Sequence, residues 1–317
     1  MSVPVLSIMV VNWNTRDLLE NCLRSIYEDP DSIDWEVVVV DNNSDDESLE
    51  MVERGFPQVV QVANRENMGF VQGNYLALEN SRGRYLLLLN TDTEVEQGAL
   101  GQLVGFLEAN AQVGAVGPKL LNRDGSLQFS CGISPSLGTE FLNKMLLHNL
   151  FPFFKLGRWD HADIRRVGWV SGACLMMRRE VVENVGFLDP GLYMFYEDLE
   201  WCLRIGKNGW QTFYYPSSRV LHLGGQSTRQ NLAEMLVISQ RSLFYLFKKH
   251  YGRTQLAVLR LLTLVEMVLR ILAWSFFCIL IPSRRSEGRQ RLRAYREIAA
   301  KTLLQKSYWA PAQIDSR

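Results

Sequence analysis

The fold class follows from residues 6–44, LSIMVVNWNTRDLLENCLRSIYEDPDSIDWEVVVVDNNS. Two apolar runs, residues 6–11 and 36–40, flank a segment whose apolar side chains recur at helical spacing over residues 18–27. Strands this apolar are typical of parallel sheets, where both faces are buried. A strand, a helix and a second strand in this order predict a β–α–β unit.

The same alternation continues along the first third of the chain. It predicts helices at residues 48–54 and 70–80 and strands at residues 59–62 and 85–89. We therefore expect an α/β fold with a Rossmann-like, mostly parallel open sheet and helices on both faces. In such sheets, ligands bind beyond the carboxyl ends of the strands.

Polar residues follow three of the predicted strands. Asn12 and Asn14 follow the first, Asp41 follows the second, and Asn90 and Asp92 follow the strand at residues 85–89. Because these ends share one edge of the sheet, they form a candidate site. Asp92 can hold a hard cation there; the alternative is a cap for a helix at residues 99–107. Asp41 can accept a hydrogen bond from a nucleobase, or can simply form a turn.

The pattern changes after residue 110. The sequence predicts a hairpin of strands 113–121 and 127–130 around residues 123–125, and an irregular lid or substrate loop at residues 134–165. Later elements are a strand at 170–177, helices at 180–185 and 197–208, closing strands at 211–215 and 220–223, and helix beyond residue 230.

Three carboxylates gather at Glu197, Asp198 and Glu200 beside aromatic residues. Such crowding raises at least one pKa and suits a general base, although acids also favour helix amino termini. His222 ends a predicted strand; it is either a structural histidine or a further ligand of the proposed cation. Gly69 before a helix allows close approach to a ligand, or marks only a turn.

Five motifs occur in an informative order: VNWN (11–14), VDNNS (40–44), NMGF (67–70), NTD (90–92) and FYED (195–198). Over residues 5–230 the chain resembles family 2 glycosyltransferases of GT-A fold, most of all the rhamnosyltransferase-like bacterial branch. That branch carries Tyr-Glu-Asp and a later His-x-x-Gly, which here is His222 to Gly225.

The resemblance implies an inverting sugar transfer from a nucleoside diphosphate to an acceptor hydroxyl. It implies that the nucleotide sugar is bound by Asn12, Asn14, Asp41, Asn43, Asn67, Gly69, Asn90 and Asp92, with Asp41 reading the base. Asp92 and His222 would hold Mg²⁺ or Mn²⁺. Asp198 would be the base, supported by Glu197 and Arg204, and Trp169, Gly172 and Trp201 would shape the acceptor side. Asn90 replaces the first acid of the family's Asp-x-Asp, which weakens the expected metal site.

We expect a catalytic domain over residues 1–230 and a helical region over residues 231–317. Residues 256–281 are apolar except for a polar side that contains Arg260, Glu266 and Arg270, and arginines follow over residues 284–296. About 11 residues follow Arg270, roughly 16 Å of helix, too short to span a bilayer. The pattern predicts an interfacial or re-entrant membrane anchor; alternatives are packing on the catalytic domain and a dimer interface, so a homo-oligomer stays open.

Composition and the first residues of the chain indicate the cellular compartment and the kind of partner. The 34 basic residues balance 34 acidic residues, which argues against nucleic acid as a partner. The five scattered cysteines fit reduced thiols, and no basic segment precedes the first apolar run. We therefore expect a peripheral or monotopic enzyme on the cytoplasmic face of the inner membrane. A glycan or polyprenyl-linked acceptor, in polysaccharide or cell-wall assembly, would suit that setting.

Other functions fit less well. A sugar-phosphate nucleotidylyltransferase would carry a Gly-rich loop where Asn12 to Arg16 stand, and a dinucleotide-binding oxidoreductase would carry G-x-G-x-x-G. A non-catalytic binding module would be expected to lack Asp92 or Asp198. By branch resemblance, dTDP-rhamnose is the favoured donor and UDP-hexoses come next.

Overall fold

The structure is a computed structural model that describes residues 3–29, 33–145, 159–224 and 232–304. Contacts divide the chain into two compact units. The first comprises Met1–Ser134, Trp159–Pro190 and Glu197–Gln226, and the second comprises Pro135–Arg158, Gly191–Tyr196 and Ser227–Arg317.

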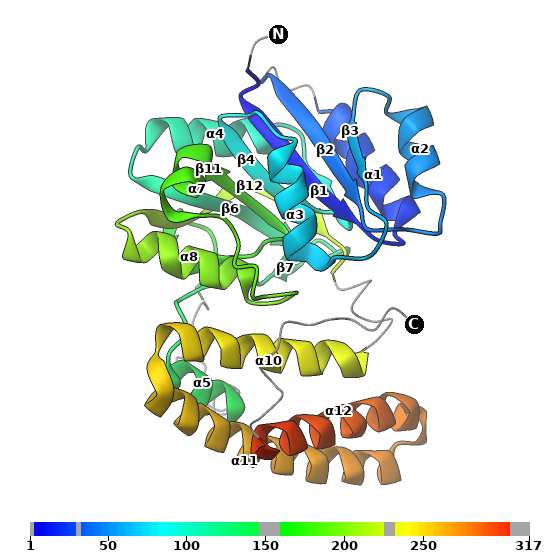
Figure 1. The fold of residues 1–317 in the computed structure, drawn as a ribbon, viewed down its shortest axis with the longest axis vertical. Coiled ribbons are helices and arrows are strands. Elements are labelled where there is room, and N and C mark those ends of the chain that lie inside the picture. Colours follow the sequence, from blue (N-terminus) through cyan, green and yellow to red (C-terminus); the bar gives the residue numbers. More distant parts are fainter. Residues whose placement is uncertain (1–2, 30–32, 146–158, 225–231, 305–317) are drawn as a thin grey trace. The chain divides into compact units, whose positions relative to one another are not determined.

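The first half of the sheet in unit 1 is parallel, as the sequence predicts (Figure 1). Its strands lie in the order β3-β2-β1-β4 and pair in parallel throughout. Their bounds are Leu6–Asn12 (β1), Trp35–Asp41 (β2), Val60–Ala63 (β3) and Tyr85–Asn90 (β4). Four leucines of β4 and the valines of β2 are buried, which is why these runs carry almost no polar residue.

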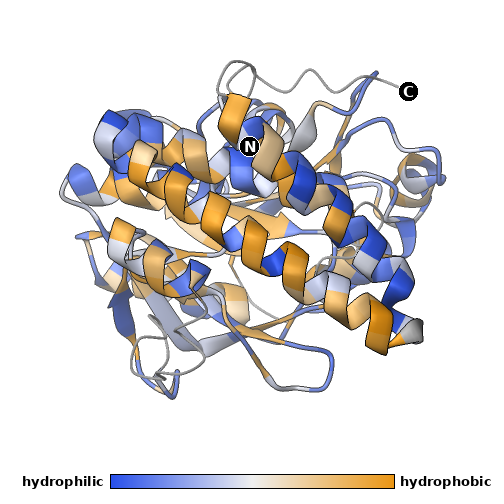
Figure 2. Ribbon diagram, turned by 90° about the horizontal axis from the view of Figure 1, so that it is seen from below, coloured by the Kyte–Doolittle hydropathy of each residue, from blue (hydrophilic) through white to orange (hydrophobic). Residues whose placement is uncertain are grey.

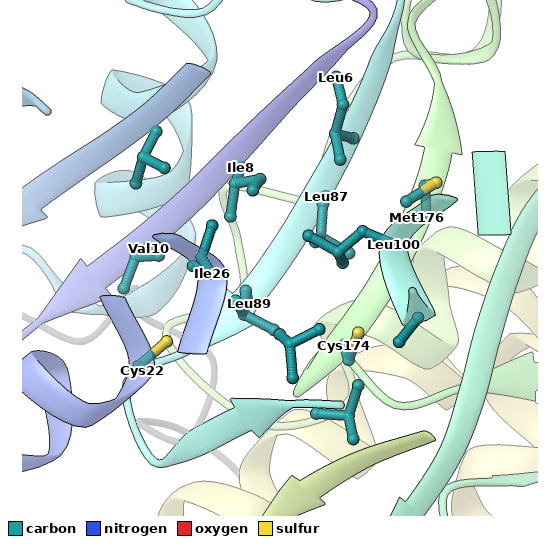
Figure 3. Packing of buried hydrophobic residues seen from close by; sticks show 14 of the residues in the cluster. Leu6, Ile8, Val10, Cys22, Ile26, Leu87, Leu89, Leu100, Cys174 and Met176 are labelled. Carbon is teal, nitrogen blue, oxygen red and sulfur yellow. The ribbon is translucent and has the colours of Figure 1, made fainter. Parts of the chain in front are cut away.

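Helices cover both faces of this sheet. They are α1 (Arg16–Tyr27), α2 (Ser48–Gly55), α3 (Gly69–Glu79) and α4 (Ala99–Ala109). Alternate residues of β1 and β4, such as Ile8 and Leu87, pack with Ile26 of α1 and Leu100 of α4 on one face (Figure 3). On the other face α3 lies against β1, so closely that a Cβ at Gly73 would meet Val11 at 2.7 Å.

The second half of the sheet is mixed, which corrects the prediction of a mostly parallel sheet. β11 (Cys174–Arg178) runs antiparallel between β4 and β6 (Val113–Leu121), and β12 (Gln211–His222) runs parallel to β6. β5 (Thr93–Val95) pairs antiparallel with β12 at the sheet edge. Burial alone made these strands apolar, and burial does not encode direction, so the sequence pattern could not distinguish them from parallel strands.

Shorter elements complete unit 1. The predicted hairpin is confirmed, because β7 (Leu127–Gln128) pairs antiparallel with β6. The two predicted closing strands are the single strand β12, with a register shift between Tyr215 and Arg219. The remaining elements are β8 (Cys131–Gly132), β9 (Arg165–Val167), β10 (Trp169–Val170), α7 (Arg179–Val185) and α8 (Glu197–Lys207).

The regular elements of unit 2 that the structure describes are all helices. Its elements are α5 (Leu137–Lys144), α10 (Leu232–His250), α11 (Gly252–Leu280), the short 3-10 helix η2 (Pro282–Arg284) and α12 (Arg285–Leu304). α5 lies where we expected irregular chain; its capping box pairs Ser136 with Thr139, a polar start signal that the aromatic-rich context obscured. Of the rest of the predicted lid, residues 146–158 lie outside the described residues, and residues 159–164 form an irregular segment that leads into β9.

The polar side of α11 faces inward and its apolar side faces outward. Lys144 Nζ lies 2.8 Å from Glu266 Oε2, both side chains are buried, and Glu266 Oε1 accepts from Arg270 Nε at 2.8 Å. The exposed side carries Leu261, Val265, Val268, Leu272, Phe276 and Ile279, and the helix is largely apolar in Figure 2. Within the described ranges, no helix has the length and apolar composition that crossing a bilayer requires.

Candidate functional site

The predicted strand ends meet at one edge of the sheet. Asn12 pairs in register with Asp41, and Val11 with Asn90. Asn12 Nδ2 donates to Asp41 Oδ1 at 2.8 Å, and its Oδ1 accepts from the Thr15 hydroxyl at 2.7 Å. Asn12 is fully buried, so its side chain joins the first two strand ends from within.

Asp41 is engaged by its own loop. Its Oδ1 also accepts from the Ser44 hydroxyl at 2.6 Å, and its Oδ2 accepts from Ser44 N at 2.8 Å. With 1% of its surface exposed, the carboxylate anchors the loop after β2. Its contact with a nucleobase stays a prediction.

Asn14 and Asn43 shape the loops that carry them. Both have a left-handed backbone, with φ of 51° and 63°, which asparagine tolerates better than most residues. Asn14 N donates to Ser44 Oγ and its Oδ1 accepts from Asp45 N, each at 2.9 Å. These bonds join the β1 and β2 loops into one surface.

The predicted glycine start of α3 lies beside those loops. Gly69 has φ of 80°, a conformation that disfavours other residues, and its N–H donates to Asn67 Oδ1 at 2.9 Å. Its carbonyl accepts from Asn42 Nδ2 at 3.1 Å. The NMGF motif is thereby tied to the end of β2.

Asp92 and His222 come together although 130 positions separate them in sequence. Thr93 of β5 pairs with His222 of β12, and Leu223 N donates to the Asp92 carbonyl at 2.8 Å. His222 Nε2 lies 3.2 Å from Asp92 Oδ1, yet this buried nitrogen has no aligned hydrogen-bond partner among the described residues. A carboxylate and an imidazole nitrogen that face each other without a hydrogen bond fit a shared divalent cation.

The pair alone would make only part of a coordination sphere. Across the described ranges, no three His, Cys, Asp or Glu side chains gather as a metal-binding group. Asn90, two positions before Asp92, is half-buried at the end of β4. Two protein ligands and open positions are typical of sites where a cation also binds phosphate oxygens.

Glu197 and Asp198 begin α8. Asp198 Oδ2 accepts from Gly172 N at 2.8 Å and its Oδ1 accepts from Leu199 N at 2.7 Å. Burial raises the pKa of Asp198 above its usual range. Burial and the adjacent Asp198 carboxylate raise the pKa of Glu197 to about 8. Glu197 Oε2 is buried and finds no partner in the described part of the chain, so the two groups favour a single shared negative charge.

Two residues predicted around this acid pair have different surroundings. Arg204 bonds to Glu200 and to the carbonyls of Val185, Gly186 and Phe187. It therefore holds the segment after α7, which corrects its predicted support of Asp198. Trp201 is fully buried and donates from Nε1 to the Gly186 carbonyl, so it cannot line an acceptor surface.

The other two predicted acceptor-side residues, Gly172 and Trp169, have different neighbours. Gly172 is brought directly to Asp198, whose Cβ would lie 3.5 Å from a Cβ added at the glycine. Trp169 in β10 is half-buried and covers Gly132 of β8. Gln128 also belongs to the surroundings of His222, because its Oε1 lies 2.5 Å from His222 Nδ1. A lone glutamine in a predicted hairpin carries no sequence signal for such a role.

Comparisons with known proteins agree with this architecture. A sequence model of the family described as "Glycosyltransferase like family 2" matches residues 4–241. The N-acetylglucosaminyl-diphospho-decaprenol L-rhamnosyltransferase of Mycobacterium tuberculosis is 28% identical over 271 residues, which cover 78% of this chain and 86% of the relative.

Two solved structures resemble the fold at 19% identity. The mannosyltransferase PcManGT from Pyrobaculum calidifontis, in complex with GDP-Man and Mn²⁺, has a TM-score of 0.59 over 97% of this chain and 89% of that one. GalNAc-T7 with UDP, GalNAc and Mn²⁺ has a TM-score of 0.53 over 69% of this chain and 43% of that one.

Proposed function

The chain belongs to the family 2 glycosyltransferases and has their GT-A fold, and from this premise we propose that it moves a sugar from a nucleoside diphosphate, with inversion, to a hydroxyl of a lipid-linked glycan. The observation that carries the proposal is the contact of Asp92 with His222 at the edge where the strands end. The transfer would be one step in the assembly of a cell-surface polysaccharide or of the cell wall.

Asp92 and His222 hold Mg²⁺ or Mn²⁺ in this proposal. The unsatisfied His222 Nε2 beside a carboxylate supports it, and both structural neighbours were solved with Mn²⁺. When bound, the ion neutralises negative charge on the departing diphosphate. Asn90 supplies an amide oxygen where a second acid would otherwise stand.

Asp198 is the proposed base. A base must reach the acceptor hydroxyl as it attacks, and its pKa must lie near the working pH. Burial shifts the pKa of Asp198 in that direction. The N–H of Gly172 orients Oδ2, and a proton retained by Glu197 leaves the pair's charge for Asp198.

The nucleotide is bound along the joined loops after β1 and β2 and at the start of α3. These loops carry Asn12, Asn14, Asp41, Asn43, Asn67 and Gly69. The similarity to a rhamnosyltransferase supports dTDP-rhamnose as the first donor to test, and UDP-hexoses follow. Because Asp41 is already bonded to Ser44, a base contact would use the remaining lone pair of Oδ2.

Unit 2 is proposed to rest on the cytoplasmic leaflet of the inner membrane. The exposed apolar side of α11 fits the acyl boundary of a bilayer, and exposed Arg284, Arg285, Arg289, Arg293 and Arg296 fit anionic headgroups. The relative's decaprenol-linked substrate supports a lipid-linked acceptor. An acceptor that cannot leave the bilayer requires an enzyme that comes to it.

A thermal-shift screen tests the donor site. Purified full-length protein is heated with dTDP-rhamnose, UDP-hexoses or GDP-mannose, with and without Mn²⁺. We expect one nucleotide class to raise the melting temperature, and Mn²⁺ to increase that shift. Equal shifts from every nucleotide sugar, unaffected by Mn²⁺, would contradict the proposed site.

A further inference from the structure

We propose that Gln128 is a positioning residue for His222, and that it holds the imidazole so that Nε2 presents its lone pair to a divalent cation beside Asp92. The inference rests on the proposed metal site and goes beyond it by naming what orients the histidine. Gln128 lies in β7, outside every motif that points to the family.

The orientation of the Gln128 amide follows from its neighbours. Its Nε2 donates to Asn122 Oδ1 at 3.0 Å and to the backbone carbonyl of His222 at 3.2 Å. Both partners are oxygens that can only accept, so the amide nitrogen must face them. Oε1 is then the atom at 2.5 Å from His222 Nδ1.

This arrangement fixes the tautomer of a neutral His222. An amide oxygen has no hydrogen to give, so Nδ1 carries the hydrogen and Nε2 carries the lone pair. That lone pair lies 3.2 Å from Asp92 Oδ1, another electron-pair donor. A cation between two such donors satisfies both, and partners on the far ring nitrogen are the usual means of orienting a histidine ligand.

A tight hairpin holds Gln128 in place. Gln128 pairs with Leu120 of β6, and at the turn Asn122 N donates to the Ser126 carbonyl at 2.8 Å. Asn122 Nδ2 also donates to Ser126 Oγ at 2.9 Å, which leaves its Oδ1 for Gln128. The turn at residues 122–126 therefore supports a ligand on another strand.

The test measures Mn²⁺ binding directly, with the full-length protein and Mn²⁺ alone, from the electron paramagnetic resonance signal of free Mn²⁺. Gln128→Leu removes the bond to the ring, Gln128→Glu keeps an acceptor for Nδ1–H, and Gln102→Leu on the exposed surface of α4 is the matched control. Each variant is also made in a His222→Ala background.

We expect Gln128→Leu to weaken Mn²⁺ binding by about 10-fold or more, as loss of an outer-shell partner commonly does. Gln128→Glu should stay within about threefold of wild type, because a carboxylate is a frequent partner of ligating histidines. In the His222→Ala background, Gln128→Leu should cause no further loss. Unfolding curves of every variant identify any that fail to fold.

Three results would overturn the inference. The first is wild-type Mn²⁺ affinity in Gln128→Leu, and the second is an equal loss of Mn²⁺ affinity in Gln128→Leu and in a folded Gln128→Glu. The third is a loss of Mn²⁺ affinity on Gln128→Leu that is as large in the His222→Ala background as in the wild type. If His222→Ala itself binds Mn²⁺ as wild type does, the metal site of the proposed function is wrong, which is a separate outcome.

Discussion

Asp198→Asn separates chemistry from donor binding. Removing a positioned general base commonly lowers a rate by about 10²–10⁴-fold, which corresponds to about 2.7–5.4 kcal/mol of transition-state stabilisation. Donor affinity should not change, because the Asp198 oxygens accept from Gly172 N and Leu199 N, which belong to neither the loop after β1 nor the loop after β2.

The substitution also has a structural cost. The carboxylate accepts two backbone N–H bonds with different oxygens, whereas the amide has one oxygen. One N–H donor is left facing an NH₂ group, at a cost of about 1–3 kcal/mol of folding free energy. A lower melting temperature with a cooperative transition is therefore expected alongside the loss of transfer.

Single-turnover transfer of labelled sugar gives the rate, and calorimetric titration with the nucleoside diphosphate gives donor affinity. Asp163→Asn, at an exposed position of the same unit, is the control. A folded Asp198→Asn that transfers at the wild-type rate would remove Asp198 as the base. A rate that falls only in parallel with donor affinity would make it a binding residue instead.

Three further predictions follow from the site and from unit 2. The pKa of Glu197 is about 8 in the folded protein and near 4.5 in the unfolded chain. The free energy of unfolding therefore falls as pH rises between these two values, because the unfolded chain releases this proton more readily. Glu197→Gln should remove that pH dependence. The melting temperature of the variant relative to wild type should rise from pH 5 to pH 8; a constant difference would count against the raised pKa. Asp92→Ala should abolish the part of donor affinity that Mn²⁺ adds and leave affinity in EDTA unchanged, as titrations with and without Mn²⁺ will report; a Mn²⁺ effect of wild-type size would exclude Asp92. Leu272→Glu with Phe276→Glu should lower binding to anionic vesicles by at least about 10-fold in sedimentation, since burying each of these side chains in an apolar phase contributes about 1.5–3 kcal/mol; unchanged sedimentation would reject α11 as the contact surface.

Patterns that depend on burial were readable from the sequence. The apolar runs of β1, β2 and β4 predict their strands because a strand buried on two faces tolerates little else. The polar residues that end those strands, Asn12 and Asp41, lie in register as expected. Local spacing also predicts α1 and α8 to within a few residues.

Features that depend on a distant partner were not readable. Trp201 follows the acid pair closely in sequence, but its position on α8 points its side chain into the core. Arg204 has the charge to assist an acid, yet its donors bond to Glu200 and to three carbonyls at and just after the end of α7. The antiparallel course of β11 is set by the path of the chain on either side, and an apolar run gives no sign of direction.

Because β5 pairs with β12, Asp92 and His222 can meet only late in the synthesis of the chain. Asp92 leaves the ribosome well before His222, and β12, which carries His222, is the last strand of the sheet in chain order. A nascent chain that has emerged only through β11 already contains the residues of β1 to β4 and Gly172, but not His222, the second of the proposed cation ligands. The proposed pair of cation ligands is therefore complete only after β12 has emerged.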